Sequence, residues 1–238
     1  MGAFALLLSV RVYPVDKPLN LTSHDVVARA RRLLGTRRVG HAGTLDPLAT
    51  GVLTLLVGEA TKLSPYLTAA DKHYLAWVAL GAGTPTLDAE GPITARADEG
   101  ALSTISPSAV EAAAGEFMTV TSQRPPAFSA VKQEGTRSYA DARQGRITEP
   151  PERPVAYHQA KLLAFAPQRD ALPQRFTRTP AGWRPDPAGR EFELPPVLEP
   201  LPTALFALTV GAGTYVRAFA RDLGAALGVP AHLAGLVR

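Results

Sequence analysis

The chain has 238 residues, of which 46% are apolar and 19% are charged, and its formal net charge at pH 7 is +4. This balance is typical of a globular protein that is long enough to bury a substantial core. The absence of cysteine excludes disulfides, thiol nucleophiles and cysteine-based zinc or iron–sulfur sites. The small positive net charge permits a nucleic-acid partner without requiring one.

The chain opens with apolar residues 4–10, which we predict to form a strand. No Lys or Arg precedes them and no small-residue cleavage pattern follows, so they do not match a secretory signal peptide. No run approaches the roughly 20 apolar residues that a membrane-spanning helix needs. We therefore expect a cytoplasmic protein without a membrane partner.

A helix is predicted after the extended stretch 10–15. Thr22 and Asp25 have the spacing of a capping box, apolar residues follow at helical intervals, and Gly35 ends the pattern. Five arginines lie on this helix or just after it: Arg29, Arg31, Arg32, Arg37 and Arg38. They either contact phosphate groups or form an ordinary solvated face, and the sequence leaves both interpretations open.

The most distinctive stretch is 40–51, Gly-His-Ala-Gly-Thr-Leu-Asp-Pro-Leu-Ala-Thr-Gly. Its glycines let the backbone approach a ligand closely, and Pro47 restricts Asp46 to an extended or turn conformation. The apolar run 52–57 that follows is predicted to be a buried strand. Asp46 is therefore either a nucleophile or base held beside the core, or part of a simple Asp-Pro turn.

Two further side chains invite a functional interpretation. Tyr74 stands at the polar start of a strand predicted at 72–80, where it either faces a pocket or packs in the core. Arg217 falls in the first turn of a helix that Tyr215 opens, away from its apolar stripe. The helix dipole disfavours a cation there, so Arg217 either has a nearby anion or is a flexible surface arginine, and the sequence leaves both interpretations open. Other predicted elements are helices at 59–67, 107–117 and 137–144 and a strand at 205–210.

Residues 166–200 differ from the rest because they contain eight of the 22 prolines and show little periodicity. We predict a long surface excursion here, disordered or in an expanded loop, with a hairpin around Trp183. Loops of this length are usually functional or disordered.

Several common chemistries are absent from the sequence. The five histidines do not form a zinc motif, and neither a phosphate-binding loop of the Walker type nor a G-x-S-x-G nucleophile elbow occurs. A single loop carboxylate, a loop histidine, tyrosines and arginines remain. This set suits a cofactor-free reaction on an anionic substrate that uses one carboxylate.

Five blocks in this sequence resemble the TruB family of tRNA pseudouridine synthases, in the family's order. They are Val-Asp-Lys-Pro at 15–18 with Thr-Ser-His at 22–24, the stretch 40–51, Asp-Lys-His-Tyr at 71–74, Gln-Arg-Pro-Pro-Ala-Phe-Ser-Ala-Val-Lys at 123–132, and Gly-Thr-Tyr-Val-Arg at 213–217. The resemblance implies an α+β pseudouridine synthase fold, with a central, mostly antiparallel mixed sheet flanked by helices and loops. It also implies isomerisation of uridine 55 in the T-arm loop of tRNA, without a metal or other cofactor.

The resemblance assigns three catalytic residues. Asp46 is the aspartate that attacks the base or the sugar, and the sequence does not decide between the two. Tyr74 would stack on the flipped base and remove the proton left on its new carbon attachment point. Arg217 would pair with Asp46, and a neighbouring guanidinium favours the ionised form of a carboxylate.

Four further residues are assigned to substrate binding. Tyr215 would pack against the flipped base, His41 would help to hold the T loop open, and Leu236 would supply apolar or backbone contact in the pocket. Lys132, the last residue of the fourth block, is also assigned to substrate binding. The expected partner is tRNA, bound by a monomer that requires no protein partner.

The family implies one catalytic domain over residues 1–238, with the excursion at 166–200 inserted. Family members normally continue into a small RNA-binding domain of the PUA kind, which we expect to be absent here. Two alternatives stay open: a non-catalytic tRNA-binding or folding factor on the same scaffold, and a subunit of a larger guided ribonucleoprotein.

Overall fold

The computed structural model describes residues 10–127, 132–133, 136–137, 150–180 and 182–238. Of the strand predicted at 4–10 only Val10 belongs to this set, and of the helix predicted at 137–144 only Arg137; the rest of both predictions lies outside it. No helix in the described ranges is long and apolar enough to cross a membrane.

A seven-stranded sheet forms the centre of the molecule and confirms the expected mostly antiparallel mixed arrangement. Six strands follow one another in the order β1-β3-β16-β4-β15-β11, and β2 pairs with β3 outside this path. The pairing of β16 with β3 is parallel, and the other pairings are antiparallel. The strands are β1 (Val10–Lys17), β2 (Val39–Ala42), β3 (Ala49–Gly58), β4 (Lys72–Leu80), β11 (Tyr157–Ala166), β15 (Thr203–Val210) and β16 (Ala231–Val237).

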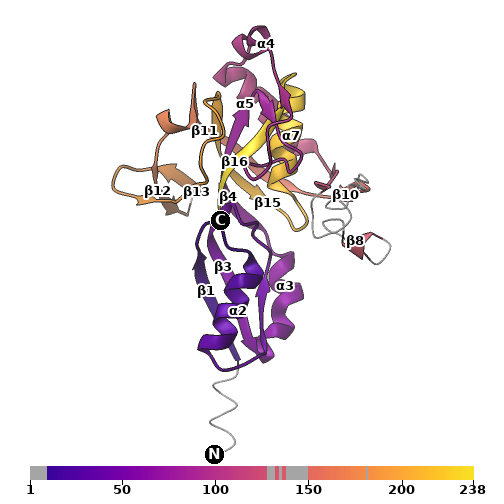
Figure 1. Ribbon diagram of the computed structural model, residues 1–238, viewed down its shortest axis with the longest axis vertical. Helices are drawn as coiled ribbons and strands as arrows, with labels where there is room; N and C mark the ends of the chain where they lie inside the picture. Colours follow the sequence, from indigo (N-terminus) through magenta and orange to yellow (C-terminus); the bar gives the residue numbers. More distant parts are fainter. Residues whose placement is uncertain (1–9, 128–131, 134–135, 138–149, 181) are drawn as a thin grey trace, which may run out of the picture.

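Helices surround this sheet in two groups (Figure 1). In Figure 1, α2 and α3 accompany β1 and β3 in the N-terminal part, while α4, α5 and α7 lie at the other end. There α7 packs against β16 and β4, and α5 packs against β11. The α-helices are α2 (Ser23–Leu33), α3 (Ser64–Ala69), α4 (Glu99–Ser103), α5 (Pro107–Glu116) and α7 (Val216–Ala226), and the 3-10 helices are η1 (Glu59–Leu63), η2 (Phe117–Thr119) and η3 (Arg169–Ala171).

Smaller sheets of two or three short strands accompany the central sheet in the described residues. They are β5 (Ala82–Gly83) with β6 (Ala95–Arg96), β7 (Ser122–Gln123) with β10 (Arg153–Pro154), β8 (Lys132–Gln133) with β9 (Thr136–Arg137), and β12 (Arg175–Thr179) between β13 (Gly182–Pro185) and β14 (Arg190–Glu191).

The predicted capping box at the start of α2 is present. The hydroxyl of Thr22 accepts a hydrogen bond from the Asp25 amide at 3.0 Å, and the Asp25 carboxylate accepts one from the Thr22 amide at 2.9 Å.

Two of the five arginines near α2 have partners within the fold: Arg31 donates to the Val39 carbonyl at 2.9 Å, and Arg38 pairs with Glu59. These two therefore support the local fold.

Strand β4 is buried on both faces because each face carries its own hydrophobic cluster. Tyr74, Ala76 and Val78 face the cluster that α5 and α7 complete, whereas Leu75 and Trp77 face a second, smaller cluster. Successive side chains of a strand point to opposite faces, so β4 separates the two clusters. This alternation directs Tyr74 toward α7, where the site lies.

The structure corrects the expectation of a disordered or expanded loop over 166–200. The predicted hairpin around Trp183 is present, with β12 and β13 antiparallel and Arg178 opposite Trp183, and β14 adds a third strand. Phe176 is 1% exposed and meets Trp77 edge-on at 5.7 Å between ring centroids. These strands have two to five residues, too few for a clear alternation, and the tertiary contact with Trp77 stabilises them.

Candidate active site

Asp46 lies in the loop between β2 and β3, and both neighbouring residues are fixed to other elements. The amide of Leu45 donates to the Ser23 hydroxyl at 2.8 Å, and that hydroxyl donates to the Leu45 carbonyl at 3.0 Å. The Pro47 carbonyl accepts from the Asn20 amide at 2.9 Å. The start of α2 thus holds the loop, and the Asp46 side chain remains 36% exposed.

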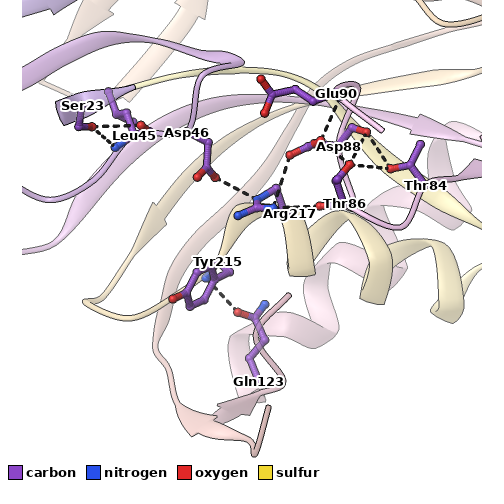
Figure 2. Close-up of polar contacts among 10 residues, drawn as sticks. All are labelled: Ser23, Leu45, Asp46, Thr84, Thr86, Asp88, Glu90, Gln123, Tyr215 and Arg217. Atoms are coloured by element: carbon purple, nitrogen blue, oxygen red, sulfur yellow. Dashed lines mark hydrogen bonds and ion pairs between the residues drawn. The ribbon is translucent and has the colours of Figure 1, made fainter. Parts of the chain in front are cut away.

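Arg217 reaches Asp46 from the first turn of α7 (Figure 2). Its Nε lies 2.9 Å from Asp46 Oδ2, and its Nη1 donates to the Thr86 carbonyl at 3.0 Å. The Arg217 side chain is only 8% exposed. Of the two interpretations left open by the sequence, the structure shows the one with a nearby anion, and the guanidinium is a buried group rather than a flexible surface one.

A second carboxylate, Asp88, lies behind Arg217 and is 1% exposed. Its Oδ2 is 3.5 Å from Arg217 Nη1, while its Oδ1 accepts from the Thr86 hydroxyl at 2.6 Å and from the Glu90 amide at 3.0 Å. Burial raises the pKa of Asp88, and the Arg217 guanidinium opposes that rise. Figure 2 shows the guanidinium between the two carboxylates, which together fix its direction.

The backbone that carries Asp88 is held against β16. Leu233 donates to the Leu87 carbonyl and its own carbonyl accepts from the Ala89 amide, each at 3.0 Å. Leu87 adopts a φ of 62°, a left-handed conformation that is rare for leucine. Such a conformation costs on the order of 1–3 kcal/mol and persists only where the surrounding contacts hold it. These contacts fix the position of the carboxylate behind Arg217.

Two more titratable groups lie near Asp46. Lys17 is fully buried and donates to the carbonyls of Pro18, Leu21 and Pro47 at 2.9, 2.6 and 3.3 Å; burial lowers its pKa to about 8, against the effect of Asp46. Desolvation raises the pKa of Glu90 to about 7, and the negative charges of Asp88 and Asp46 add to this rise.

Tyr74 and Tyr215 line the same cavity as Asp46. Burial raises the pKa of the Tyr74 phenol, and the neighbouring Arg238 guanidinium acts in the opposite direction. Tyr215 occupies the N-cap position of α7, where its amide donates to the Gln123 side-chain oxygen at 2.9 Å. Gln123 is itself fixed because its side-chain NH₂ donates to the Tyr157 hydroxyl at 2.8 Å.

A cavity of about 260 Å³ lies over these side chains. Its wall contains five of the seven residues singled out from the sequence, namely Asp46, Tyr74, Tyr215, Arg217 and Leu236. Leu236 lies in β16, opposite Ala49 of β3 and Ala76 of β4, so the strand pairing presents it to the cavity.

The other two residues are His41 and Lys132. His41 lies in β2 opposite Leu55 and does not line this cavity; burial lowers the pKa of its imidazole. Lys132 belongs to β8, and its side chain lies outside the part of the chain that the structure describes.

Sequence reasoning missed three positioning groups: Asp88, Lys17 and Gln123. The sequence signal for Asp88 is slight: Thr84, Thr86 and Asp88 alternate, and both threonine hydroxyls bond within this group. Lys17 and Gln123 stood inside the resembling blocks without a role of their own. The partners of Gln123 are distant in sequence, and those of Lys17 are backbone carbonyls, which any residue carries, so no local pattern marks either residue.

Comparison with known proteins identifies the family. Residues 31–177 match the model of the TruB family pseudouridylate synthase (N terminal domain). The chain is 55% identical over 227 residues to the tRNA pseudouridine synthase B of Deinococcus deserti, covering 95% of this chain and 72% of that protein. The chain belongs to the TruB family. The corresponding enzyme of Thermus thermophilus is 53% identical over 228 residues, or 71% of its length.

Solved structures agree on the fold of this TruB family member. In the crystal structure of a Cbf5-Nop10-Gar1 complex, one chain matches with a TM-score of 0.60 and 26% identity, over 95% of this chain and 47% of that one. The archaeal box H/ACA sRNP Nop10-Cbf5 complex contains a match with a TM-score of 0.57 and 24% identity. The present chain spans about half the length of these solved chains. Family membership makes it a pseudouridylate synthase, which is an isomerase.

Proposed function

We propose that this enzyme converts uridine 55 in the T-arm loop of tRNA to pseudouridine. Its relatives from Deinococcus and Thermus carry the name tRNA pseudouridine synthase B, which supports isomerisation of uridine in tRNA. The resembling sequence blocks support position 55. The observation that carries the proposal is the ion pair between Asp46 and Arg217 in the wall of one cavity. Nothing in the comparisons favours the non-catalytic binding factor.

The reaction exchanges one bond for another without net change in composition. The N1–C1′ bond of uridine breaks, the base turns, a C5–C1′ bond forms, the C5 proton leaves, and N1 gains a proton. We assign the nucleophilic role to Asp46, which attacks either the base or the sugar. Arg217 stabilises the negative charge of the carboxylate and directs one oxygen into the cavity.

A uridine within folded RNA must leave its stack before Asp46 reaches it, at a cost of a few kcal/mol. Stacking on an aromatic side chain offsets about 1–3 kcal/mol per base. We assign this stacking to Tyr74 and packing against the other side of the base to Tyr215. Tyr74 would also accept the C5 proton as its phenolate; burial disfavours that ionised form by raising the pKa of the phenol, and the neighbouring Arg238 guanidinium favours it.

The remaining assignments extend this proposal. Leu236 would supply apolar contact to the base, His41 would hold the T loop open outside the cavity, and Lys132 would contact RNA. We further propose that residues 1–238 act as one catalytic domain in the cytoplasm, as a monomer without a required protein partner, and that 166–200 is an insertion in this domain.

Release of tritium from a T-arm stem-loop labelled at C5 of uridine tests the proposal with the purified chain alone. We expect release to be stoichiometric with the target uridine, and relocation of that uridine by one position should abolish it. Binding of the stem-loop without release would instead support the non-catalytic factor. Release that appears only with added proteins and a guide RNA would support the ribonucleoprotein alternative.

A further inference from the structure

A second cavity, of about 680 Å³, lies beside the first and has several aromatic rings in its wall. Its wall includes the aromatic rings of Phe176, Trp183 and Phe192 from the small sheet and its C-terminal flank, together with His73 of β4. Trp183 and Phe192 meet edge-on at 5.7 Å between centroids, and the Arg190 guanidinium lies 5.0 Å from the centre of the Phe192 ring. Unstacked nucleobases bind on accessible aromatic rings beside arginine, and Trp183 and Phe192, unlike the fully buried Phe176, are only partly buried.

The two cavities share one wall, which consists of Lys72 and Arg238. Tyr74 lines the first cavity and His73 the second, in accordance with the alternation along β4. Arg238 donates from Nε to the Val52 carbonyl at 2.8 Å and from Nη2 to the Gly43 carbonyl at 3.1 Å. We call these two side chains the ridge, because they separate the cavities and both are partly buried.

The ridge carries two positive charges without a carboxylate at ion-pair distance, as far as the described residues extend. Lys72 donates to three backbone carbonyls at the end of α3, those of Leu67 at 3.5 Å, Ala70 at 2.5 Å and Thr68. Burial lowers the pKa of Lys72, and the Arg238 guanidinium lowers it further, while Asp71 opposes this effect. The two cations therefore repel each other, and a bound anion would relieve that repulsion.

The charges around the second cavity are also predominantly positive. Its two carboxylates are already engaged within the described structure, Asp16 with Arg190 and Asp71 with His158, the latter at 3.3 Å. Arg178 in its wall adds a further positive charge. The walls therefore fit a ligand that combines a flat ring with a negative charge, as a nucleotide does.

We propose that the ridge binds the phosphodiester that joins the target uridine to a neighbouring nucleotide, whose base enters the aromatic cavity. This proposal rests on the proposed function, because it takes RNA as the substrate that fills the Asp46 cavity. A chain passing from the first cavity to the second must cross Lys72 and Arg238. One phosphate at the crossing would meet both cations, and Arg binds phosphate through charge-assisted hydrogen bonds.

The phosphate contact is tested with stem-loops in which each phosphate flanking the target uridine is replaced in turn by a neutral methylphosphonate. For the wild-type enzyme we expect one replacement to raise KM about tenfold, as loss of one charge-assisted contact does, with the single-turnover rate at saturation unchanged. Arg238→Met should raise KM similarly and lose its sensitivity to that same replacement. Arg238→Lys should retain most of the binding.

Arg96→Met is the matched control, because Arg96 is exposed and pairs with Glu199 at 3.0 Å away from both cavities. It should keep the full sensitivity to every methylphosphonate. Thermal melting of each variant shows whether the contacts of Arg238 with Gly43 and Val52 were needed for folding, and Arg238→Lys provides the comparison if Arg238→Met melts early.

The base contact is tested with Trp183→Ala and a stem-loop that lacks the neighbouring base. The abasic RNA should bind the wild-type enzyme about tenfold more weakly, and Trp183→Ala should not distinguish it from intact RNA. Equal methylphosphonate sensitivity in Arg238→Met and wild type would overturn the phosphate contact. So would a fall in the single-turnover rate at unchanged KM, which would place Arg238 in the proton transfer at Tyr74. Absence of tritium release by the wild-type enzyme would mark failure of the proposed function itself.

Discussion

Arg217 Nε lies 2.9 Å from Asp46 Oδ2, which joins the first turn of α7 to the loop between β2 and β3. The same guanidinium faces Asp88 at 3.5 Å on its other side. A planar guanidinium held by two carboxylates has a fixed direction, and lysine cannot reproduce this arrangement. The proposed nucleophile is therefore oriented before any substrate binds.

Asp46→Asn is expected to abolish tritium release, with a loss of about 10⁴-fold or more, because an amide is not a nucleophile of comparable strength. RNA binding should remain close to wild type, and the melting temperature should fall modestly because the buried Arg217 loses one of its two carboxylate partners. Asp170→Asn is the control, since its side chain is 73% exposed and lies in η3. An Asp46→Asn variant that retains turnover would refute the assigned role.

Tyr74→Phe is expected to lower kcat about 100-fold and to leave KM nearly unchanged. The phenyl ring can still stack on the base, whereas the group that accepts the C5 proton is lost. Tyr66→Phe, at a side chain that is 76% exposed, should have no effect. If KM rises and kcat stays constant, Tyr74 contributes binding alone.

Asp88→Asn is expected to lower kcat about 10- to 100-fold without contact between this residue and the substrate. Arg217 would lose one of its two carboxylates and its direction toward Asp46 would relax. Because the buried Arg217 would keep only Asp46 as a carboxylate partner, the free energy of unfolding should fall by about 3 kcal/mol. Denaturant unfolding and single-turnover rates measure the two effects, and unchanged values in both would remove Asp88 from the site.

Glu90 should make stability depend on pH. Its pKa is about 7 in the folded protein, above the ordinary 4.5, so the folded state holds a proton that the unfolded state has already released. Stability is therefore expected to fall as pH rises from about 4.5 to 7. Glu90→Gln should flatten this slope in melting experiments, and Glu111→Gln on the exposed face of α5 should preserve it. If the dependence of stability on pH persists in Glu90→Gln, another titratable group causes it.

Gly51→Ala is expected to destabilise the protein by more than about 1 kcal/mol. Gly51 has a φ of +96°, and an added Cβ would lie 2.4 Å from the Arg238 carbonyl oxygen, so β3 and the end of β16 would have to separate. Gly115→Ala is the control, and we expect it to change stability in the opposite direction, because Gly115 lies within α5 with nothing near its Cβ position. That substitution should stabilise by about 0.5–1 kcal/mol. Equal melting temperatures for the two variants would contradict this account.

Local sequence patterns were sufficient to predict the elements that have strong signals. The capping box of α2, the limits of β4 and the start of α7 at Val216 follow from contacts between residues close in sequence. The small sheet over 166–200 was not predictable, since its strands are short and depend on Trp77 in a distant strand. Phe176 is buried by residues distant in sequence, and the residues next to it in the chain do not predict this.

The sequence by itself determined the family, the reaction class and the residues of the Asp46 loop, because motif blocks record residue types in order. Tertiary structure alone decided that Asp88 holds Arg217, that His41 lies outside the cavity and that Lys72 and Arg238 divide two cavities. Each of these depends on distances between side chains from different elements. Such distances arise only when the sheet pairs β3, β16 and β4 and packs α7 against them.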